Sequence, residues 1–490
     1  MSSNPSRRDA YDELPYVSLP ITYCQPALLA AQAYLRGIDA PPAAAARVLE
    51  IGAASGGNII PLAARFPRAH FHGVDLAAKH IEIGRRRIAE LELSNITLEQ
   101  GDITEADFGE QRFDYIICHG VFSWAPPAAQ RAILKVCADT LADTGIAAIS
   151  YNVFPGWHTR NVIRDICLEH TRGDGSPRQK VEAARELLNS IAGVSSDKGP
   201  YGAIVRAEAA RLKTRPASYI LGELLAAYNQ PFHVREVISQ AAEHGLAYLC
   251  ESDLTSSVPE YVAAPAAKRI REVAGSDPVA IEQYIDIFSG RSFRRSLFTR
   301  AACRAQAPSP QRLLPLHISA SARARSADAT ADLVDAAVHA TLTEQYPASV
   351  PVAELAAAHG SEAALAALYE MVARGRASIS TASVALGHGD QAQPNLWRVA
   401  RADAAAAQPW VTNLLHAPVL LSPLLRSLAP MMNGASTRDQ LVAALEAALV
   451  SGALSEKDLP RIENGGAAKR LESTVDRLIE HCARNALLVP

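Results

Sequence analysis

Residues that could do chemistry follow three short apolar runs in the first quarter of the chain. The glycine-rich turn "EIGAASGGN" (residues 50–58) closes the first run, Asp75 ends the second, and Asp102 ends the third. Glycines allow a backbone to turn tightly beneath a ligand and to present amides at the start of a helix. A dinucleotide would need glycine at Ala54 to clear its pyrophosphate. The turn therefore favours a ligand without phosphate, and Glu50 favours a cationic one.

S-adenosylmethionine meets both conditions, because it has no phosphate and carries a sulfonium and an amino acid. Asp75 is placed to accept both ribose hydroxyls, and Asp102 to accept from the adenine amino group while Ile103 packs on the ring. Either Asp alone could also be a helix cap or a loop residue, but the ordered series favours the ligand. The residues predicted to bind the donor are Glu50, Gly52, Ala54, Gly56, Asn58, Asp75, Leu76, Asp102, Ile103 and His119.

The elements that must position these residues alternate between strand and helix from residue 47 to 152. The strands read as continuous apolar runs and the helices as amphipathic segments, which predicts βαβ units and a parallel sheet covered on both faces. One helix is expected to run from Pro126 and to end at Gly145 as its C′ glycine. The predicted strands are "RVLEIG", "HFHGVD", "ITLEQGD", "FDYIICH" and "GIAAISYN".

The composition of the chain limits the classes of protein to which it can belong. The chain has 490 residues, of which 49% are hydrophobic and 20% charged, and its net charge is −3; it can build several domains. Seven cysteines, never spaced as CxxC, argue against a disulfide framework or a zinc site and fit a reducing compartment. No segment approaches a membrane span of about 18 apolar residues. We expect a cytoplasmic protein without a metal, membrane insertion or nucleic-acid partner; a homodimer is left open.

Several stretches resemble one family, the class I S-adenosylmethionine-dependent methyltransferases with a methyltransferase regulatory domain. This family includes lysine methyltransferases of bacterial outer-membrane proteins. The resemblance covers residues 11 to 300 and implies a methyl donor at the glycine turn and, for some relatives, a protein lysine as the acceptor. The stretches are "YDELPYVSLPI", "VLEIGAASGGNIIPLA", "FDYIICHGVFSWAP", "SYNVFPGWHTR", "HGLAYLCES" and "IEQYIDIFSGRSFRRSLF".

An amine acceptor must lose its proton before attack, and an aromatic channel favours this by excluding water. Such a channel also holds an alkylammonium by cation–π attraction. Aromatic residues follow the fourth and fifth strands, and Tyr11 and Tyr16 could fold over the site as a lid. His119 could take a proton or fix a carbonyl, or it could simply be a capped strand-end residue. The expected channel residues are Phe122, Trp124, Tyr151, Phe154 and Trp157, and the predicted catalytic residues are His119, Trp124, Tyr151 and Trp157.

Two differences between this chain and known methyltransferase motifs bear on the identity of the methyl acceptor. Methyltransferases of adenine or glutamine nitrogen carry an Asp/Asn-Pro-Pro-aromatic motif after the fourth strand, where this chain has "HGVF" (residues 119–122). An amide or nucleobase acceptor is therefore disfavoured. Family members usually have tyrosine at Phe122 and Phe154, so roles assigned to those hydroxyls do not carry over.

The expected fold is a doubly wound α/β sheet of class I methyltransferase type with helical insertions, plus a mainly helical, winged-helix-like C-terminal region. The last two strands are expected at residues 246–253 and 292–301, and the arginines around Arg294 are expected on solvated faces. Glu362 and Glu370 on the second helix of the winged-helix pattern favour protein packing over DNA. The predicted domains are an N-terminal lid (1–45), a donor-binding core (46–170), a regulatory region with the last strands (171–303), a linker (304–312), a winged-helix-like domain (313–400) and a helical domain (401–490).

Three functions remain open from the sequence. The chain could methylate a protein lysine, or it could methylate a small molecule or a peptide natural product. It could also bind S-adenosylmethionine as a sensor without turnover. The intact donor motif favours turnover, and the shape of the acceptor channel separates the first two functions.

Overall fold

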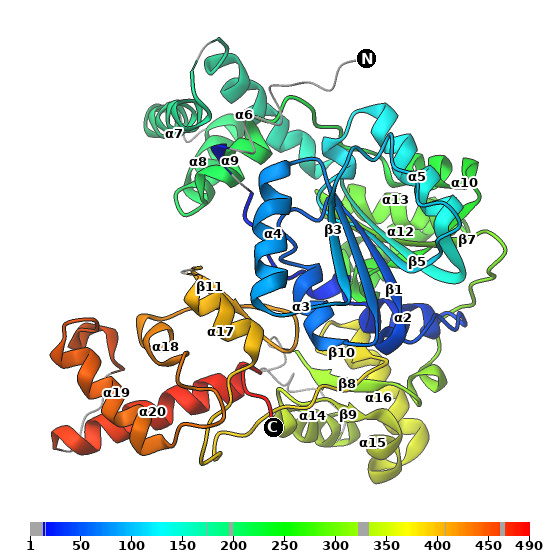
Figure 1. Ribbon diagram of the computed structural model, residues 1–490. Helices are drawn as coiled ribbons and strands as arrows, with labels where there is room; N and C mark the ends of the chain where they lie inside the picture. The colour runs from blue at the N-terminus through cyan, green and yellow to red at the C-terminus, as the bar shows by residue number, and fades with distance from the viewer. Residues whose placement is uncertain are drawn as a thin grey trace.

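The structure is a computed structural model of the chain. It describes residues 13–14, 16–173, 175–195, 199–321, 333–406, 408–460 and 466–490. Figure 1 shows a central sheet with helices on both faces, a helical lobe (α6 to α9) at the upper left, and two C-terminal units below the sheet. Within the described residues, no helix is both long enough and apolar enough to cross a bilayer.

The central sheet has seven strands in the order β3-β2-β1-β4-β5-β7-β6. Strands β1 to β5 pair in parallel, whereas β7 runs antiparallel to both of its neighbours. This arrangement confirms the predicted doubly wound sheet and the two late strands. The strands are β1 (Arg47–Ile51), β2 (His70–Asp75), β3 (Ile96–Gln100), β4 (Phe113–Cys118), β5 (Leu141–Asn152), β6 (Leu246–Glu251) and β7 (Phe293–Arg300).

Alternate side chains of each central strand enter two separate cores. In β1, Val48 packs in the core that contains α2, α3 and α4, whereas Leu49 packs in the core that contains α5 and α10. Burial on both faces explains why these strands read as continuous apolar runs. The covering helices are α2 (Pro26–Leu35), α3 (Ile59–Arg65), α4 (Ala78–Glu90), α5 (Pro127–Thr140) and α10 (Val234–Glu243).

The prediction that Gly145 ends the helix before β5 is wrong. The helix α5 ends at Thr140, Leu141 is extended, and β5 begins there, so that Gly145 lies inside the strand. A Cβ added at Gly145 would lie 3.0 Å from the carbonyl oxygen of Asp114 and 2.9 Å from a methyl carbon of Leu141. Glycine is therefore required for the close approach of β4 and β5, not for a helix terminus.

Helices inserted after β5 form a lobe with its own apolar core, which also contains Leu14 from the N-terminal segment. A second group of helices lies between β6 and β7. The helices α7 to α9 and the second group lie within the segment 171–303 that the sequence assigns to the regulatory region, whereas α6 lies within the segment 46–170 assigned to the donor-binding core. The lobe comprises α6 (Gly156–His170), α7 (Pro177–Val194), α8 (Pro200–Leu212) and α9 (Ala217–Leu224), and the second group comprises α11 (Pro259–Val262), α12 (Ala267–Ala274) and α13 (Pro278–Ser289).

Two units follow the sheet. The first has a three-stranded sheet in the order β10-β8-β9 and three helices, the composition of a winged helix. Its α16 is fixed by the regulatory region, because the Tyr261 hydroxyl donates to Glu370 at 2.5 Å. The elements are β8 (His317–Ala320), α14 (Leu333–Gln345), β9 (Val350–Pro351), α15 (Val352–His359), α16 (Ser361–Ala373) and β10 (Ala377–Ser380).

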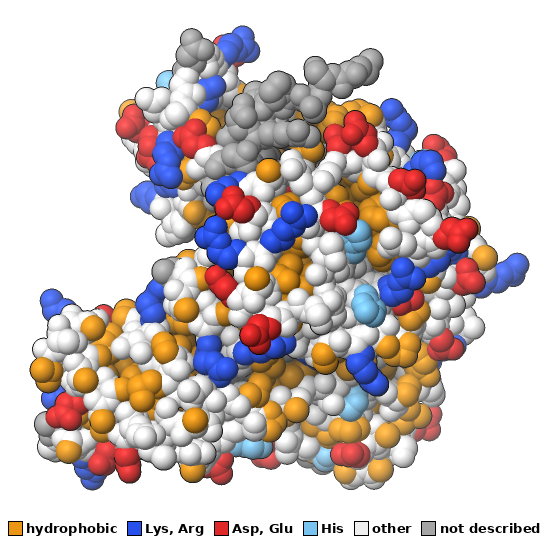
Figure 2. Space-filling view, viewed as in Figure 1, with side chains coloured by type: hydrophobic (Ala, Val, Ile, Leu, Met, Phe, Trp, Pro, Cys, Tyr) orange, Lys and Arg blue, Asp and Glu red, His pale blue; other side chains and the backbone are white. Residues whose placement is uncertain are grey.

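The second unit packs directly on the helices that cover the central sheet. Its apolar residues share one core with the α3 face of the central sheet, and Asp403 pairs with Arg87 of α4. Figure 2 shows the surface hollowed between this unit and the α6 to α9 lobe. The elements are α17 (Arg398–Ala405), β11 (Trp410–Thr412), β12 (Pro418–Leu420), α18 (Pro423–Leu428), α19 (Arg438–Val450) and α20 (Ala467–Arg484).

Arg294 is buried, contrary to the expectation of a solvated arginine cluster. Its side chain has no exposed surface, and its guanidinium donates to Asp286 at 2.8 Å and to Glu251 at 2.9 Å. A third bond reaches the Glu282 carbonyl oxygen at 2.8 Å. A buried cation needs such partners. The two acids come from β6 and α13, so the sequence of β7 alone does not reveal that Arg294 is paired and buried.

Candidate active site

The glycine turn connects β1 to α3 at the carboxyl edge of the sheet. Gly52, Ala54 and Gly56 all have positive φ angles, of 77°, 47° and 76°. The conformation at Ala54 is uncommon for a residue with a Cβ, and it is held by a hydrogen bond from the Ala54 amide to Asp75 Oδ2 at 2.8 Å. A Cβ at Gly52 would lie 2.2 Å from Val121 Cγ2. The turn is thus pressed closely against the residues that follow β4.

Glu50 is buried beneath this turn with one carboxylate oxygen unpaired. It is 4% exposed, its Oε1 accepts from Asn58 Nδ2 at 2.8 Å, and its Oε2 has no hydrogen-bond partner. Burial raises the pKa of Glu50 to about 8; the bond from Asn58 opposes the rise and the charge of Asp75 adds to it. A buried, unpaired carboxylate oxygen fits a cationic ligand, and the ammonium of S-adenosylmethionine would satisfy it.

Asp75 joins the glycine turn to the second strand. Besides the bond from Ala54, its Oδ1 accepts from the Ala77 amide at 2.9 Å and lies 3.3 Å from His80 Nδ1. Because a carboxylate has about four lone-pair positions, both oxygens can still accept from hydroxyls. Asp75 and Leu76 are both partly exposed at this edge, so the predicted ribose position remains open to a ligand.

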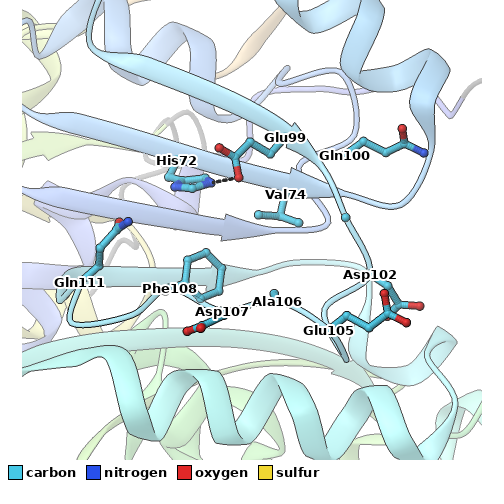
Figure 3. Close-up of a pocket in the computed structure, with 11 residues that line it drawn as sticks. His72, Val74, Glu99, Gln100, Asp102, Glu105, Ala106, Asp107, Phe108 and Gln111 are labelled. Atoms are coloured by element: carbon cyan, nitrogen blue, oxygen red, sulfur yellow. Dashed lines mark ion pairs between the residues drawn. The ribbon is translucent and has the colours of Figure 1, made fainter.

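Asp102 caps its own turn, since its Oδ1 accepts from the amide and hydroxyl of Thr104 at 3.0 and 2.8 Å. Ile103 packs against the core on the α5 face. Figure 3 shows Asp102 at the rim of a cavity of about 370 Å³, which Val74 and Phe108 also line. This cavity does not include Glu50 or the glycine turn, so it adjoins the predicted adenine end of the site and is not the whole donor pocket.

The N-terminal segment crosses the donor end of the sheet. Ser18 Oγ accepts from the Gly57 amide at 2.7 Å, and the Ile21 amide donates to Asn58 Oδ1 at 3.0 Å. The Tyr16 amide donates to His80 Nε2 at 3.2 Å, and His80 in turn contacts Asp75. Tyr11, the other residue proposed for a lid, lies outside the described residues. The segment from residue 16 to 21 is therefore tied to both ends of the donor motif.

His119 follows β4 in a hydrogen-bonded cluster. Its Nδ1 lies 2.8 Å from the Tyr23 hydroxyl and 3.0 Å from Ser150 Oγ, which also accepts from the Gly120 amide at 2.8 Å. Burial, and then the charge of Arg295, lower the pKa of His119 to about 4. The imidazole is therefore neutral at physiological pH and is oriented by fixed partners.

Two of the aromatic residues predicted for the acceptor channel are core residues instead. Tyr151 is 1% exposed and Phe122 is fully buried, and both rings contact Phe232. The Tyr151 hydroxyl is hydrogen-bonded to Ser296 Oγ at 2.7 Å. Tyr151 points into the α5 face of the sheet because strand residues alternate between faces. Phe122 lies in the 3-10 turn Phe122–Trp124 after β4 and packs in the same core, so neither ring forms an open wall.

Trp124, Phe154 and Trp157 lie in the segments that follow β4 and β5; Trp124 and Phe154 are partly exposed, and Trp157 is 3% exposed. The Trp124 and Trp157 rings meet edge to face with centroids 5.6 Å apart. The guanidinium of Arg160 lies 4.1 Å from the centroid of the Trp157 ring, and that of Arg164 lies 6.0 Å from the Trp124 ring. The protein's own arginines thus already make the cation–π contacts that the sequence assigns to a bound alkylammonium.

Several polar atoms at this edge have no hydrogen-bond partner. Asn152 Nδ2, Trp157 Nε1 and both amide atoms of Asn229 are buried and unpaired. Ser123 brings their segments together, because it accepts from the Asn152 amide through Oγ and from the Gln230 amide through its carbonyl oxygen, both at 2.8 Å. Buried polar groups are rarely left unpaired in native proteins, so this cluster indicates a place for a polar ligand.

Family models match the chain in three places. The model of a methyltransferase domain matches residues 48–145, that of a predicted methyltransferase regulatory domain matches residues 216–300, and that of the PKMT C-terminal winged helix domain matches residues 392–487. The uncharacterized protein RP028 of Rickettsia prowazekii is 34% identical over 233 residues, which span 93% of that protein. The chain belongs to the S-adenosylmethionine-dependent methyltransferases with a regulatory domain. S-adenosyl-L-methionine is accordingly its cofactor, as the glycine turn predicts.

Longer similarities cover the rest of this methyltransferase. The uncharacterized protein RP789 of Rickettsia prowazekii is 36% identical over 288 residues, and the chain spans about half, 52%, of that relative. The structure of PKMT2 from Rickettsia typhi in complex with AdoHcy matches with a TM-score of 0.84 at 24% identity, over 97% of this chain and 100% of that one. The methyltransferase therefore has the PKMT2 fold along nearly its whole length.

The family model locates a winged helix domain at residues 392–487, whereas the sequence pattern places one at residues 313–400. In the structure, the earlier segment holds the three-stranded unit with α14 to α16, and the later one holds the β11–β12 hairpin with α17 to α20. Both segments thus combine helices with a small sheet.

Sequence reasoning missed the residues that reach the donor motif from far along the chain. Ser18, His80 and His416 contact its turn or its acid. Asn229, in the regulatory region, precedes Gln230, whose amide donates to the Ser123 carbonyl oxygen after β4. Ser18 lies in the stretch "YDELPYVSLPI", which carries the family resemblance but does not by itself assign this serine a role. His80, His416 and Asn229 stand in no recognisable motif. A contact between residues 358 positions apart, such as that of Asn58 with His416, leaves no local pattern.

Proposed function

We propose that this methyltransferase transfers the methyl group of S-adenosylmethionine to the side-chain amine of a protein lysine. The cofactor supplies an electrophilic methyl group, and the chain binds, orients and dehydrates the two reactants. The glycine turn, Glu50 and Asp75 hold the donor. The acceptor approaches the ends of β4 and β5, beside Trp124 and Trp157.

The observation that carries the proposal is the cluster of unpaired polar atoms at that edge. A neutral amine has N–H groups to donate, and the unpaired carbonyl oxygen of Asn229 is an acceptor without a donor. Lysine must be neutral to attack, and nearby positive charge lowers the pKa of an amine. Arg160 and Arg164 lie beside the two tryptophans. Glu223 and Glu208 pair with Arg160 at 3.2 and 3.6 Å and offset its charge, so Arg164 supplies the larger share of the positive charge here.

Two similarities support a protein acceptor. The C-terminal match is to a domain named for PKMT, and the overall fold is that of PKMT2. The surface hollow between the α6 to α9 lobe and the C-terminal unit offers room for a polypeptide (Figure 2). We assign His119 to orientation of this region, because its low pKa makes the ring a weak base.

Methyl transfer from labelled S-adenosylmethionine into a cell extract tests the proposal. The labelled products are separated by size, and labelled protein is hydrolysed to identify the modified amino acid. We expect label in protein, recovered as methyllysine. Label only in small molecules would support the small-molecule alternative, and donor binding without any transfer would support the sensor.

The variant Asn229→Ala links the transfer to the site. Because the Asn229 amide has no partner, its removal is expected to leave the melting temperature and the donor affinity unchanged while transfer falls at least tenfold. Gln179→Ala, in the helical lobe at the exposed start of α7, serves as the matched amide control and is expected to retain full transfer.

A further inference from the structure

The turn between β11 and β12 of the C-terminal unit reaches the donor motif. His416, at this turn, is 2% exposed and has a positive φ of 59°. Histidine is one of the few residues with a Cβ that adopts the left-handed region comparatively often, and here this conformation places the buried ring against the glycine turn of the catalytic core. His416 Nε2 lies 2.8 Å from Asn58 Oδ1.

The partners of Asn58 determine the direction of each hydrogen bond. The Ile21 amide can only donate, and it donates to Asn58 Oδ1 at 3.0 Å, so this atom is the carbonyl oxygen. The other amide atom, Nδ2, then donates to Glu50 Oε1 at 2.8 Å. His416 Nε2 must therefore carry a proton and donate to Asn58. The order of the chain of contacts is His416, Asn58, Glu50.

The N-terminal segment fixes the turn on its other side. Thr22 Oγ1 donates to the His416 carbonyl oxygen at 3.0 Å, and Gln25 Nε2 donates to the Leu415 carbonyl oxygen at 3.1 Å. Gln25 in turn accepts from Arg65 of α3 at 2.7 Å. Burial, and then the charge of Arg65, lower the pKa of His416 to about 3, so the ring remains a neutral donor over the physiological range.

Asn58 has no free acceptor to offer a ligand, because its oxygen accepts from two protein donors. Its side chain instead holds Glu50 so that Oε2, the unpaired oxygen, stays available. Loss of the His416 donor would leave a buried Asn58 oxygen less satisfied and allow the amide to turn away from Glu50.

We propose that His416 is a positioning residue for the methyl donor, and that the C-terminal unit thereby completes the donor site of the catalytic core. The inference rests on donor binding and not on the nature of the acceptor. A C-terminal unit that only recognised an acceptor would not need this contact.

The test is a comparison of His416→Leu with His416→Gln. Leucine and glutamine side chains have similar size, but only glutamine retains an N–H donor for Asn58. Isothermal titration with S-adenosylhomocysteine measures affinity without turnover. We expect Leu to raise the dissociation constant at least tenfold and Gln to raise it no more than threefold. Leu420→Ala, 78% exposed on β12 of the same hairpin, is the control and is expected to bind as wild type does.

Equal affinities for the Leu and Gln variants, or a wild-type affinity for Leu, would overturn the proposal. If either variant fails to fold, hydrogen exchange of the wild-type protein decides. Coupling is reciprocal, so saturating S-adenosylhomocysteine should slow exchange of the His416 and Ala417 amides, which donate to Asn413, but not of amides in α19. Unchanged exchange at the turn would refute the coupling. Failure of lysine methylation alone would leave both results intact.

Discussion

Replacing Glu50 by glutamine should stabilise the protein without donor and weaken donor binding. Glutamine has the same shape as glutamate, and its carbonyl oxygen can still accept from Asn58 Nδ2. The change removes a carboxyl group that is buried, half-satisfied and close to Asp75. The effect on stability should depend on pH.

The direction of this pH dependence follows from the raised pKa of Glu50. The pKa is about 8 in the folded protein, against an ordinary value of 4.5. The folded state binds this proton more tightly than the unfolded state, so ionisation opposes folding. The cost is absent below pH 4.5, grows as the pH rises, and is complete above pH 8. At about 1.4 kcal/mol for each pKa unit, it reaches roughly 3 kcal/mol at pH 7.

Thermal unfolding of wild type and Glu50→Gln, without donor, measures this cost. We expect equal melting temperatures near pH 4.5 and a variant that melts a few degrees higher at pH 8. Glu110→Gln, at an exposed loop position, is the control and should show no such divergence. Titration with S-adenosylmethionine at pH 8 should show about tenfold weaker binding by Glu50→Gln, because the ammonium loses a charged partner.

A difference in melting temperature that does not change between pH 4.5 and pH 8 would refute the reasoning. It would mean that the Glu50 carboxyl is not held protonated by burial. Unchanged donor affinity would show that its unpaired oxygen does not face the ligand.

Two further predictions concern buried groups. Arg294→Met should lower the free energy of unfolding by about 3–5 kcal/mol, because it leaves the acids around it without a cation. Urea denaturation measures this loss, and Arg304→Met at an exposed position is the control. A loss below 1 kcal/mol would contradict the buried network. The pKa of His119, about 4, predicts that kcat has no inflection between pH 6 and 7 from this residue. The pH profile of His119→Asn should therefore match that of wild type in this range, and an inflection that the variant removes would contradict the assignment.

The sequence by itself determined the sheet and the donor motif. Parallel strands buried on both faces must be apolar throughout, and a tight turn beneath a ligand needs glycine, so both leave local patterns. Glu50, Gly52 and Asp75 could be identified because each lies at the end of a strand or in the turn that follows it. The regulatory insertions and the two late strands could be located with the help of the family resemblance, because a sheet of this class needs two further strands after "GIAAISYN".

Only the tertiary structure decided which side chains are accessible and what lies opposite the donor motif. An aromatic residue after a strand has the same local pattern whether it faces a channel or, as Tyr151 does, the core. The buried pairing of Arg294 depends on acids contributed by β6 and α13. Likewise, the contact of His416 with Asn58 forms because a separate unit folds back onto the sheet, and a single hydrogen bond between distant segments imposes no periodicity on the sequence that contains it.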